Sequence, residues 1–305
     1  MNWSESELWL RKELTGIYEE QEAANISSWV LEHLTGAPRI DRLTRRDESL
    51  NEEQLQQLTA IHDRLLRHEP VQYVLGESYF YGMQLFVDNN VLIPRPETEE
   101  LVDWIVNDVK ASGKDVFERR PFEADATTQL KILDVGTGSG CIALALKKAM
   151  PKAEVWGCDV SEGALNVARR NGSELDIRVD FQGLNFLDSA QQKSLPTVDI
   201  VVSNPPYIPL NNKEAMRPNV VKHEPHTALF VPDNNALVFY EALAKFGHHR
   251  LYSGGSIYCE IHEDLAGAVT SLFQNEGYTT ELKKDMQGKD RMVKATAPTQ
   301  PSRTP

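Results

Sequence analysis

The feature of this 305-residue chain that most restricts its fold is a regular alternation of short apolar runs and amphipathic segments from Leu130 onward. The apolar runs are rich in Val and Ile, which is typical of buried strands in a parallel sheet. The segments between them place apolar residues at the three- and four-residue spacing of helices. This alternation predicts an α/β fold, a doubly wound and mainly parallel sheet with helices on both faces.

Seven strands and four helices are expected in this part of the chain. The strands are predicted at 131–135, 154–158, 179–182, 199–203, 256–261, 279–283 and 291–295, and the helices at 141–149, 162–174, 237–251 and 265–276.

The first 75 residues have a different character and predict a small helical bundle. Three amphipathic segments are separated by stop signals such as Gly36-Ala37-Pro38, and Asn51 is placed to cap the third. The bundle contains no evident chemistry, so it is either a support domain or a docking surface for a protein partner.

Aromatic and β-branched runs over 71–82 and 83–93 predict a β-hairpin, assigned as a linker over 76–95. The sheet domain is expected over 96–297 and begins with a helix that ends near Lys110. Residues 111–129 are polar and nearly aperiodic, which indicates an insertion or flexible loop, and residues 298–305 are expected to be a disordered tail.

Composition excludes several classes of protein. The net charge of −13 argues against a chain whose main task is to bind nucleic-acid backbone, and no membrane partner is expected because no apolar run approaches spanning length. Three cysteines inside apolar runs indicate reduced, buried thiols. No signal or transit peptide is recognisable, so we expect a cytoplasmic protein.

The stretch from Asp199 to Tyr207, with sequence DIVVSNPPY, indicates a binding site. Two prolines end a buried strand at once and leave Asn204 and Tyr207 at its carboxyl end, where open α/β sheets bind ligands. The Asn204 amide oxygen, a main-chain carbonyl and an aromatic ring together suit a planar group that bears an NH2. A strand-ending turn without function is the alternative.

A glycine-rich segment between the first strand and its helix indicates a cofactor site. Gly136, Gly138 and Gly140 allow the backbone to pass close to a ligand, and Asp159 at the end of the second strand can accept hydrogen bonds from ribose hydroxyls. Cys141 stands where a dinucleotide fingerprint has its last glycine. Together these features favour S-adenosylmethionine over NAD.

Three further side chains have two interpretations each. Asp134 either stabilises the turn or attracts the positive charge of the cofactor, and Phe186 either stacks on adenine or belongs to the core. Arg95, held extended between two prolines, is either a surface arginine or a loop residue at the border of the site. His223, Glu224 and His226 are interpreted as part of a site wall, and no metal is expected, because no fourth ligand is evident.

The chain resembles the HemK-like (PrmC) peptide chain release factor N5-glutamine methyltransferases. The resemblance covers about residues 70 to 295 and depends on motifs in family order: PVQY at 70–73, LIPRPETEEL at 92–101, ILDVGTGSGCI at 132–142, VSNPPYI at 202–208, EP at 224–225, ALF at 228–230 and KDRM at 289–292.

This resemblance implies a Rossmann-like methyltransferase fold with seven strands and an N-terminal helical domain that docks substrate. It implies transfer of a methyl group from S-adenosylmethionine, with S-adenosylhomocysteine as product, to the glutamine of the Gly-Gly-Gln loop in release factors. The cofactor would be bound by Gly136, Thr137, Gly138, Ser139, Gly140, Asp159, Phe186 and Asn204, and the substrate glutamine would be bound and aligned by Asn204, Pro205, Pro206 and Tyr207.

The sequence departs from the family pattern at three places. Asn185 replaces an aspartate expected at the adenine amine, His262 replaces a glycine after Glu260-Ile261, and the 111–129 insertion is long. Two alternatives stay open at this point. A DNA adenine-N6 methyltransferase would use the same Asn-Pro-Pro-Tyr chemistry on an extruded base, and a non-catalytic binding protein could retain the fold.

Overall fold

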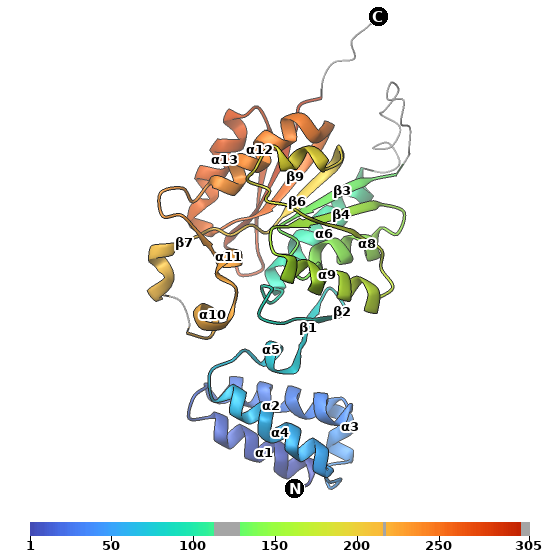
Figure 1. The fold of residues 1–305 in the computed structure, drawn as a ribbon, viewed down its shortest axis with the longest axis vertical. Coiled ribbons are helices and arrows are strands. Elements are labelled where there is room, and N and C mark those ends of the chain that lie inside the picture. The colour runs from blue at the N-terminus through green and yellow to red at the C-terminus, as the bar shows by residue number, and fades with distance from the viewer. Residues whose placement is uncertain (113–128, 216–217, 300–305) are drawn as a thin grey trace, which may run out of the picture. The chain divides into compact units, whose positions relative to one another are not determined.

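The computed structural model describes residues 1–112, 129–215 and 218–299. The chain forms two compact units (Figure 1). The first comprises Met1–Glu77 with Met216–His223, and the second comprises Ser78–Ala215 with Glu224–Pro305. Part of the predicted 111–129 insertion, residues 113–128, and the end of the predicted tail, residues 300–305, lie outside the described residues.

The first unit is helical. Its described helices are α1 (Trp3–Leu14), α2 (Glu20–Thr35), α3 (Arg39–Thr44), α4 (Glu52–Leu65), α5 (Val71–Leu75) and α10 (Pro218–His223). Asn51 caps α4 in a reciprocal capping box with Gln54, and Gly36 ends α2 in the left-handed region at φ 64°. The helices enclose their own apolar core, which includes Leu10, Val30, Leu31, Leu58 and Leu65.

One local prediction for this part of the chain is wrong. Residues 71–75 form helix α5 where a strand was expected, because Pro70 starts the helix with a fixed φ and Gly76 ends it at φ 70°. In the second unit, a 3-10 helix lies over Leu210–Ala215.

The second unit is built around a seven-stranded sheet with the order β10-β11-β9-β6-β3-β4-β5. The strands are β3 (Lys131–Val135), β4 (Glu154–Asp159), β5 (Asp180–Gly183), β6 (Val198–Ser203), β9 (Leu251–Glu260), β10 (Thr279–Lys284) and β11 (Asp290–Thr296). Neighbouring strands from β9 to β5 pair in parallel, whereas β11 pairs antiparallel with both β9 and β10.

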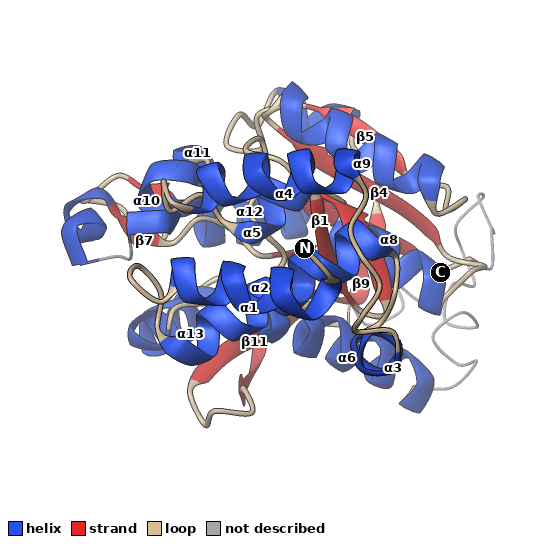
Figure 2. Cartoon of the chain, turned by 90° about the horizontal axis from the view of Figure 1, so that it is seen from below, coloured by secondary structure: helices blue, strands red, loops and turns tan. Residues whose placement is uncertain are grey.

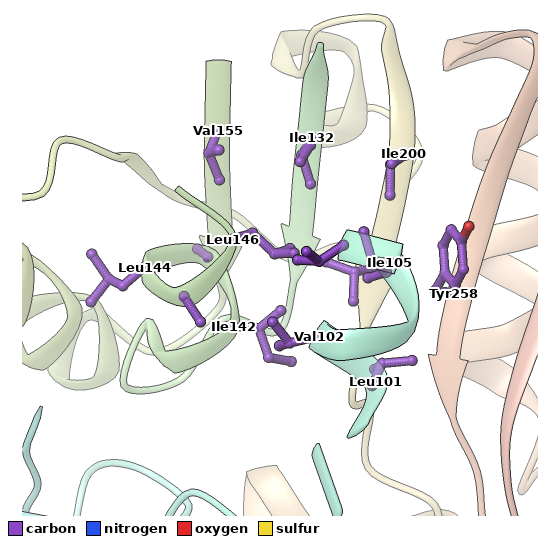
Figure 3. Close-up of a cluster of buried hydrophobic side chains, with 14 of the residues drawn as sticks. Leu101, Val102, Ile105, Ile132, Ile142, Leu144, Leu146, Val155, Ile200 and Tyr258 are labelled. Carbon is purple, nitrogen blue, oxygen red and sulfur yellow. The ribbon is translucent and has the colours of Figure 1, made fainter. Parts of the chain in front are cut away.

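Helices cover both faces of this sheet, as Figure 2 shows with strands in red and helices in blue. The helices α6 (Pro96–Ala111), α8 (Cys141–Ala149) and α9 (Glu162–Glu174) share a core with one face, and α12 (Val238–Arg250) and α13 (Ala266–Asn275) share a core with the other. Consecutive strand residues alternate between the two cores, so Ile132 belongs to the first and Leu133 to the second. Figure 3 shows the first core, where strand residues Val155, Ile132 and Ile200 face the α6 residues Val102 and Ile105 and the α8 residue Leu146.

Two small sheets complete the second unit. Strands β1 (Glu77–Phe80) and β2 (Met83–Phe86) form a hairpin, and β7 (Ile208–Pro209) pairs with β8 (Phe230–Val231) beside the short helix α11 (His226–Leu229). Phe80, Met83 and Leu85 are buried in the same core as α6 and α8. The hairpin is therefore packed as part of the sheet unit.

The predicted sheet is confirmed, since all seven strands and four helices form close to their expected positions. The largest difference is the start of β9, which begins at Leu251 and includes Gly254 and Gly255, residues that weaken a strand when judged from sequence alone. Short 3-10 segments lie at Gln191–Ser194 and Glu263–Leu265. Within the described ranges, no helix combines the length and the apolar character needed to cross a membrane.

Two helical glycines give a matched test of packing in this unit. A Cβ at Gly247 in α12 would overlap the Tyr278 hydroxyl. That hydroxyl is buried and donates a hydrogen bond to the Ala244 carbonyl. A Cβ at Gly267 in α13, in contrast, would meet no atom within 4 Å. We expect Gly247→Ala to lower the free energy of unfolding by about 1–3 kcal/mol and Gly267→Ala to be neutral or slightly stabilising. Urea denaturation of both variants measures this, and equal effects would contradict the packing argument.

Candidate functional site

A pocket opens at the carboxyl ends of β3, β4 and β6. The chain runs outward from β3 through β4 to β5 and then returns to β6 on the other side of β3, so these strand ends form the topological switch point where open sheets bind ligands. The space between its lining atoms amounts to about 1030 Å³, a volume that includes the solvent at the open mouth. All of its lining residues belong to the second unit.

The glycine-rich loop forms one wall of the pocket, and Gly136, Thr137, Gly138 and Ser139 line it. Gly136 and Gly138 have φ values of 72° and 54°, and a Cβ added to either would enter open space. Both Gly136 and Thr137 donate their amides to the Cys158 carbonyl at the end of β4. The loop is therefore fixed to the sheet while its glycines leave room above the backbone.

Gly140 has a different role from the other two glycines. It is not among the pocket-lining residues, and it caps α8 at φ 80°. A Cβ there would approach the Ala168 Cβ and the Phe181 ring to 3.1 Å. Its local function is close packing of the loop against α9 and β5.

Asp159 connects the loop to the end of β4. One carboxylate oxygen accepts the Gly138 amide at 3.0 Å, and the other accepts the Ser161 amide at 2.9 Å. Burial raises the pKa of this carboxyl, although the backbone amides oppose the shift. Since Asp159 also lines the pocket, its remaining acceptor positions are available to hydroxyl groups of a ligand.

The structure favours the turn-stabilising interpretation of Asp134. Its Oδ2 accepts the Thr137 hydroxyl at 2.7 Å and the Ala143 amide at 3.3 Å, and Asp134 is not among the residues that line the pocket. Oδ1 is buried without a hydrogen-bond partner among the described residues. Burial raises the pKa of this carboxyl to about 7.

Phe186 belongs both to the core and to the pocket. It is buried, its ring lies 5.2 Å from that of Phe246, and it lines the cavity. Asn185 also lines the pocket, but its side-chain oxygen accepts the Leu187 amide at 3.0 Å. The asparagine that replaces the expected aspartate therefore has a local structural bond of its own.

The segment after β6 supplies the opposite wall. Asn204, Pro205 and Pro206 line the pocket together with the glycine loop. Tyr207 is not among the lining residues, and its ring lies 6.0 Å from that of His262. Burial, together with the nearby Glu260, raises the Tyr207 pKa well above its usual value, so the hydroxyl is neutral.

Sequence reasoning missed the partners of Asn204. Its Nδ2 donates to the Thr98 hydroxyl at 3.1 Å, and that hydroxyl donates to Oε2 of Glu260 at 2.6 Å. Burial raises the pKa of Glu260 to about 7, although Thr98 and Arg291 favour its ionised form. Thr98 lay inside the LIPRPETEEL motif, but nothing in the sequence linked it to a residue 162 positions away.

Arg95 lines the pocket and forms an ion pair with Glu224. Its guanidinium contacts both carboxylate oxygens at 2.7 Å, and the Glu224 side chain is almost fully buried. Burial raises the Glu224 pKa, and Arg95 opposes that shift. Glu224 thus joins an ion pair in the site wall.

No cluster of three or more His, Cys, Asp or Glu side chains suited to a metal ion occurs in the described ranges.

The fold and the pocket define a class of protein. A sheet of this order, with a glycine-rich loop after β3 and an acidic residue at the end of β4, belongs to the S-adenosylmethionine-dependent methyltransferases. Residues 121–226 match the methyltransferase small domain family, and residues 7–76 match the PrmC N-terminal domain family.

Relatives in bacteria identify the family. The release factor glutamine methyltransferase of Flavobacterium psychrophilum is 37% identical over 92% of this chain and 94% of its own length. The enzyme of the same name from Bacteroides thetaiotaomicron is 37% identical over 94% of this chain and 97% of its own length. The chain belongs to the release factor glutamine methyltransferase family.

A solved structure supports the fold alone. The hMettl16 catalytic domain, in complex with the MAT2A 3'UTR hairpin 6, is 14% identical and superposes with a TM-score of 0.53 over 84% of this chain and 86% of that one.

The pocket has the features that the shared cofactor of this class requires. Open space lies over Gly136 and Gly138, and an acidic side chain and an aromatic ring line the same cavity.

The raised pKa of Glu260 predicts how stability depends on pH. Folding raises this pKa from 4.5 to about 7. The stabilising contribution of Glu260 to the free energy of unfolding is therefore fully present below pH 4.5, and it is lost as the pH rises through 7. The loss amounts to about 3 kcal/mol. We therefore expect the unfolding free energy of Glu260→Gln to fall less than that of the unchanged protein between about pH 5 and pH 8. Part of the decline should remain, because Asp134 contributes in the same direction.

Urea denaturation at a series of pH values measures this difference. A decline of equal size in both proteins would show that Glu260 is ionised in the folded state throughout the range.

Proposed function

We propose that this chain transfers a methyl group from S-adenosylmethionine to the side-chain amide nitrogen, N5, of the glutamine in the Gly-Gly-Gln motif of peptide chain release factors. S-adenosylhomocysteine is the second product. One observation supports this most strongly. A chain that is 37% identical to release factor glutamine methyltransferases over nearly its full length presents an asparagine and two prolines in the same pocket as the glycine-rich loop.

The proposed cofactor residues are Gly136, Thr137, Gly138, Ser139, Gly140, Asp159, Phe186 and Asn204. When bound, S-adenosylmethionine supplies a methyl group that its sulfonium already activates. The loop backbone would hold the cofactor, and Asp159 would accept hydrogen bonds from its ribose. Phe186, which packs against Phe246 in the core and lines the pocket, would offer its ring to the adenine. Gly140 would contribute indirectly, through the packing that shapes the loop.

The proposed substrate and catalytic residues are Asn204, Pro205, Pro206 and Tyr207. An amide nitrogen is a poor nucleophile because its lone pair is delocalised, so the main work of the protein is alignment and electrostatic stabilisation. The Asn204 side-chain oxygen and the Pro205 carbonyl would accept the two N–H groups of the substrate amide. This would hold the nitrogen in place and stabilise the positive charge that develops on it.

Tyr207 requires a modified role, because it is not among the residues that line the pocket. We propose that it packs against the substrate amide only when the release factor is bound. The transferred methyl group leaves a protonated amide nitrogen that loses its proton readily, so no strong general base is needed.

The helical first unit is proposed to dock the release factor, with the sheet unit over 96–297 as the catalytic domain. This is supported by the match of residues 7–76 to the PrmC N-terminal domain family. A cytoplasmic location follows from a substrate that acts in translation, and neither nucleic acid nor membrane is proposed as a partner. The comparisons give no support to the DNA adenine methyltransferase alternative.

The central prediction concerns the product. Incubation of a purified release factor with this protein and S-adenosylmethionine is expected to add one methyl group to the glutamine of the Gly-Gly-Gln loop. Peptide mass spectrometry with fragmentation locates the added group. A release factor with Gln→Ala in that loop is the control, and an unmodified loop glutamine in the unchanged factor would refute the proposal.

A second prediction concerns Asn204. Removal of one preorganised hydrogen-bonding group at a developing charge typically costs about 10²–10³ in kcat. Asn204→Ala should therefore lose turnover by about that factor, while cofactor affinity, measured by calorimetry, falls by a much smaller factor because the other cofactor residues remain. Asn275→Ala, at the exposed end of α13, is the matched control and should keep normal turnover. Normal turnover of Asn204→Ala would remove the proposed role.

A further inference from the structure

We propose that Thr98 and Glu260 are positioning residues that hold the Asn204 amide with its oxygen, and not its NH2 group, available to the substrate. The inference deepens the proposed function and rests on it, because it concerns how a substrate amide is bound. It depends on the hydrogen bonds from Asn204 to Thr98 and from Thr98 to Glu260, here called the Asn204–Thr98–Glu260 chain.

The direction of each hydrogen bond is fixed by chemistry when Glu260 is ionised, the state that prevails above about pH 7. A hydroxyl has a single proton, and the Thr98 hydroxyl gives it to the Glu260 carboxylate at 2.6 Å. Thr98 can then only accept from Asn204, and the one group on the asparagine side chain able to donate is its NH2, which lies at 3.1 Å. The carboxylate therefore selects one of the two orientations of the Asn204 amide.

The sheet register brings these groups together. Strands β6 and β9 pair in parallel with Ser203 opposite Cys259, so Asn204 and Glu260 are the next residues on adjacent strands. Thr98 reaches them from the first turn of α6. Thr98 and Glu260 are each only 2% exposed, so water does not compete for the bond between them.

Glu260 is itself held in place. The Tyr240 hydroxyl in α12 donates to its main-chain carbonyl at 3.0 Å, and Arg291 in β11 donates to the carbonyl of Ile261 next to it. The acceptor at the end of the Asn204–Thr98–Glu260 chain is therefore supported by two further elements of the fold.

The orientation matters because the substrate group is an NH2. With the Asn204 oxygen available, the side chain accepts one N–H of the substrate amide. With the amide turned over, two NH2 groups would face each other, and a donor would be left unpaired in a buried site. Loss of Thr98 removes the partner that distinguishes these two orientations, so the productive one would be populated less.

A purely structural role for Thr98 is the competing explanation, since the same bonds tie α6 to β9. The two explanations differ in what they predict about Asn204. If Thr98 acts through Asn204, its removal has no consequence for turnover once the Asn204 side chain is gone. A general loss of structure would lower turnover in either background.

The experiment measures kcat, KM for the release factor and cofactor affinity in Thr98→Val, which keeps the shape of the side chain and removes its hydroxyl. We expect kcat to fall about 10- to 100-fold, with cofactor affinity and KM within about twofold of the starting values. Thr98→Ser, which restores the hydroxyl, should recover most of the lost turnover. Thr296→Val, which removes another interstrand hydroxyl contact of the same sheet, to Ser256, is the matched control and should not change kcat.

The decisive comparison repeats Thr98→Val in the Asn204→Ala background, with radiolabelled cofactor so that residual turnover is measurable. We expect less than a twofold further loss there. Unchanged kcat in the single variant, or an equal loss in both backgrounds, would overturn the proposal. If Thr98→Val does not fold, as judged by thermal unfolding, Thr98→Ala provides the same comparison. Failure of the unchanged protein to methylate any release factor would instead refute the proposed function, a result distinct from either outcome.

Discussion

The site depends on the register in which β6 pairs with its two neighbours. Ser203 lies opposite Val135 of β3 and opposite Cys259 of β9, so three parallel strands end at the same level. The Ser203 hydroxyl strengthens this arrangement by donating to the Val135 carbonyl at 2.7 Å. Gly136 and Asn204 follow β3 and β6, and Glu260 is the last residue of β9. A shift of one residue in β6 would turn its side chains to the opposite face and separate Asn204 from its partners.

This arrangement buries ionisable groups at a cost in stability. Asp134 and Glu260 are both buried, with pKa values raised to about 7, so their charged forms destabilise the folded protein above that pH. Each is retained next to a hydroxyl that it orients, Thr137 for Asp134 and Thr98 for Glu260. An apolar pair would avoid the cost of burying a charge at either position, but it could not fix the direction of a hydrogen bond.

The sequence was sufficient for the sheet and for the local motifs of the pocket. Strand and helix periodicity located the core, and the glycine loop and the Asn204-Pro205-Pro206 segment were placed at strand ends that do meet. What could not be predicted were interactions between distant segments, such as Thr98 with Glu260, because no local pattern specifies which buried hydroxyl meets which carboxylate. Gly140 and Tyr207 belong to the expected loops, but neither lines the pocket, because Gly140 packs against α9 and the Tyr207 ring lies beside that of His262.

The start of α6 takes part in two polar contacts beside the pocket. Arg95 precedes the helix and pairs with Glu224, and Thr98, three residues later, bonds to Glu260. Pro94 and Pro96 fix the backbone on either side of Arg95, which has extended φ and ψ values of −102° and 142°. Because prolines restrict the unfolded chain as well, less conformational entropy is lost when this segment is ordered. The proline pair can therefore hold a guanidinium and a hydroxyl in fixed directions at a helix entry that would otherwise be free to move.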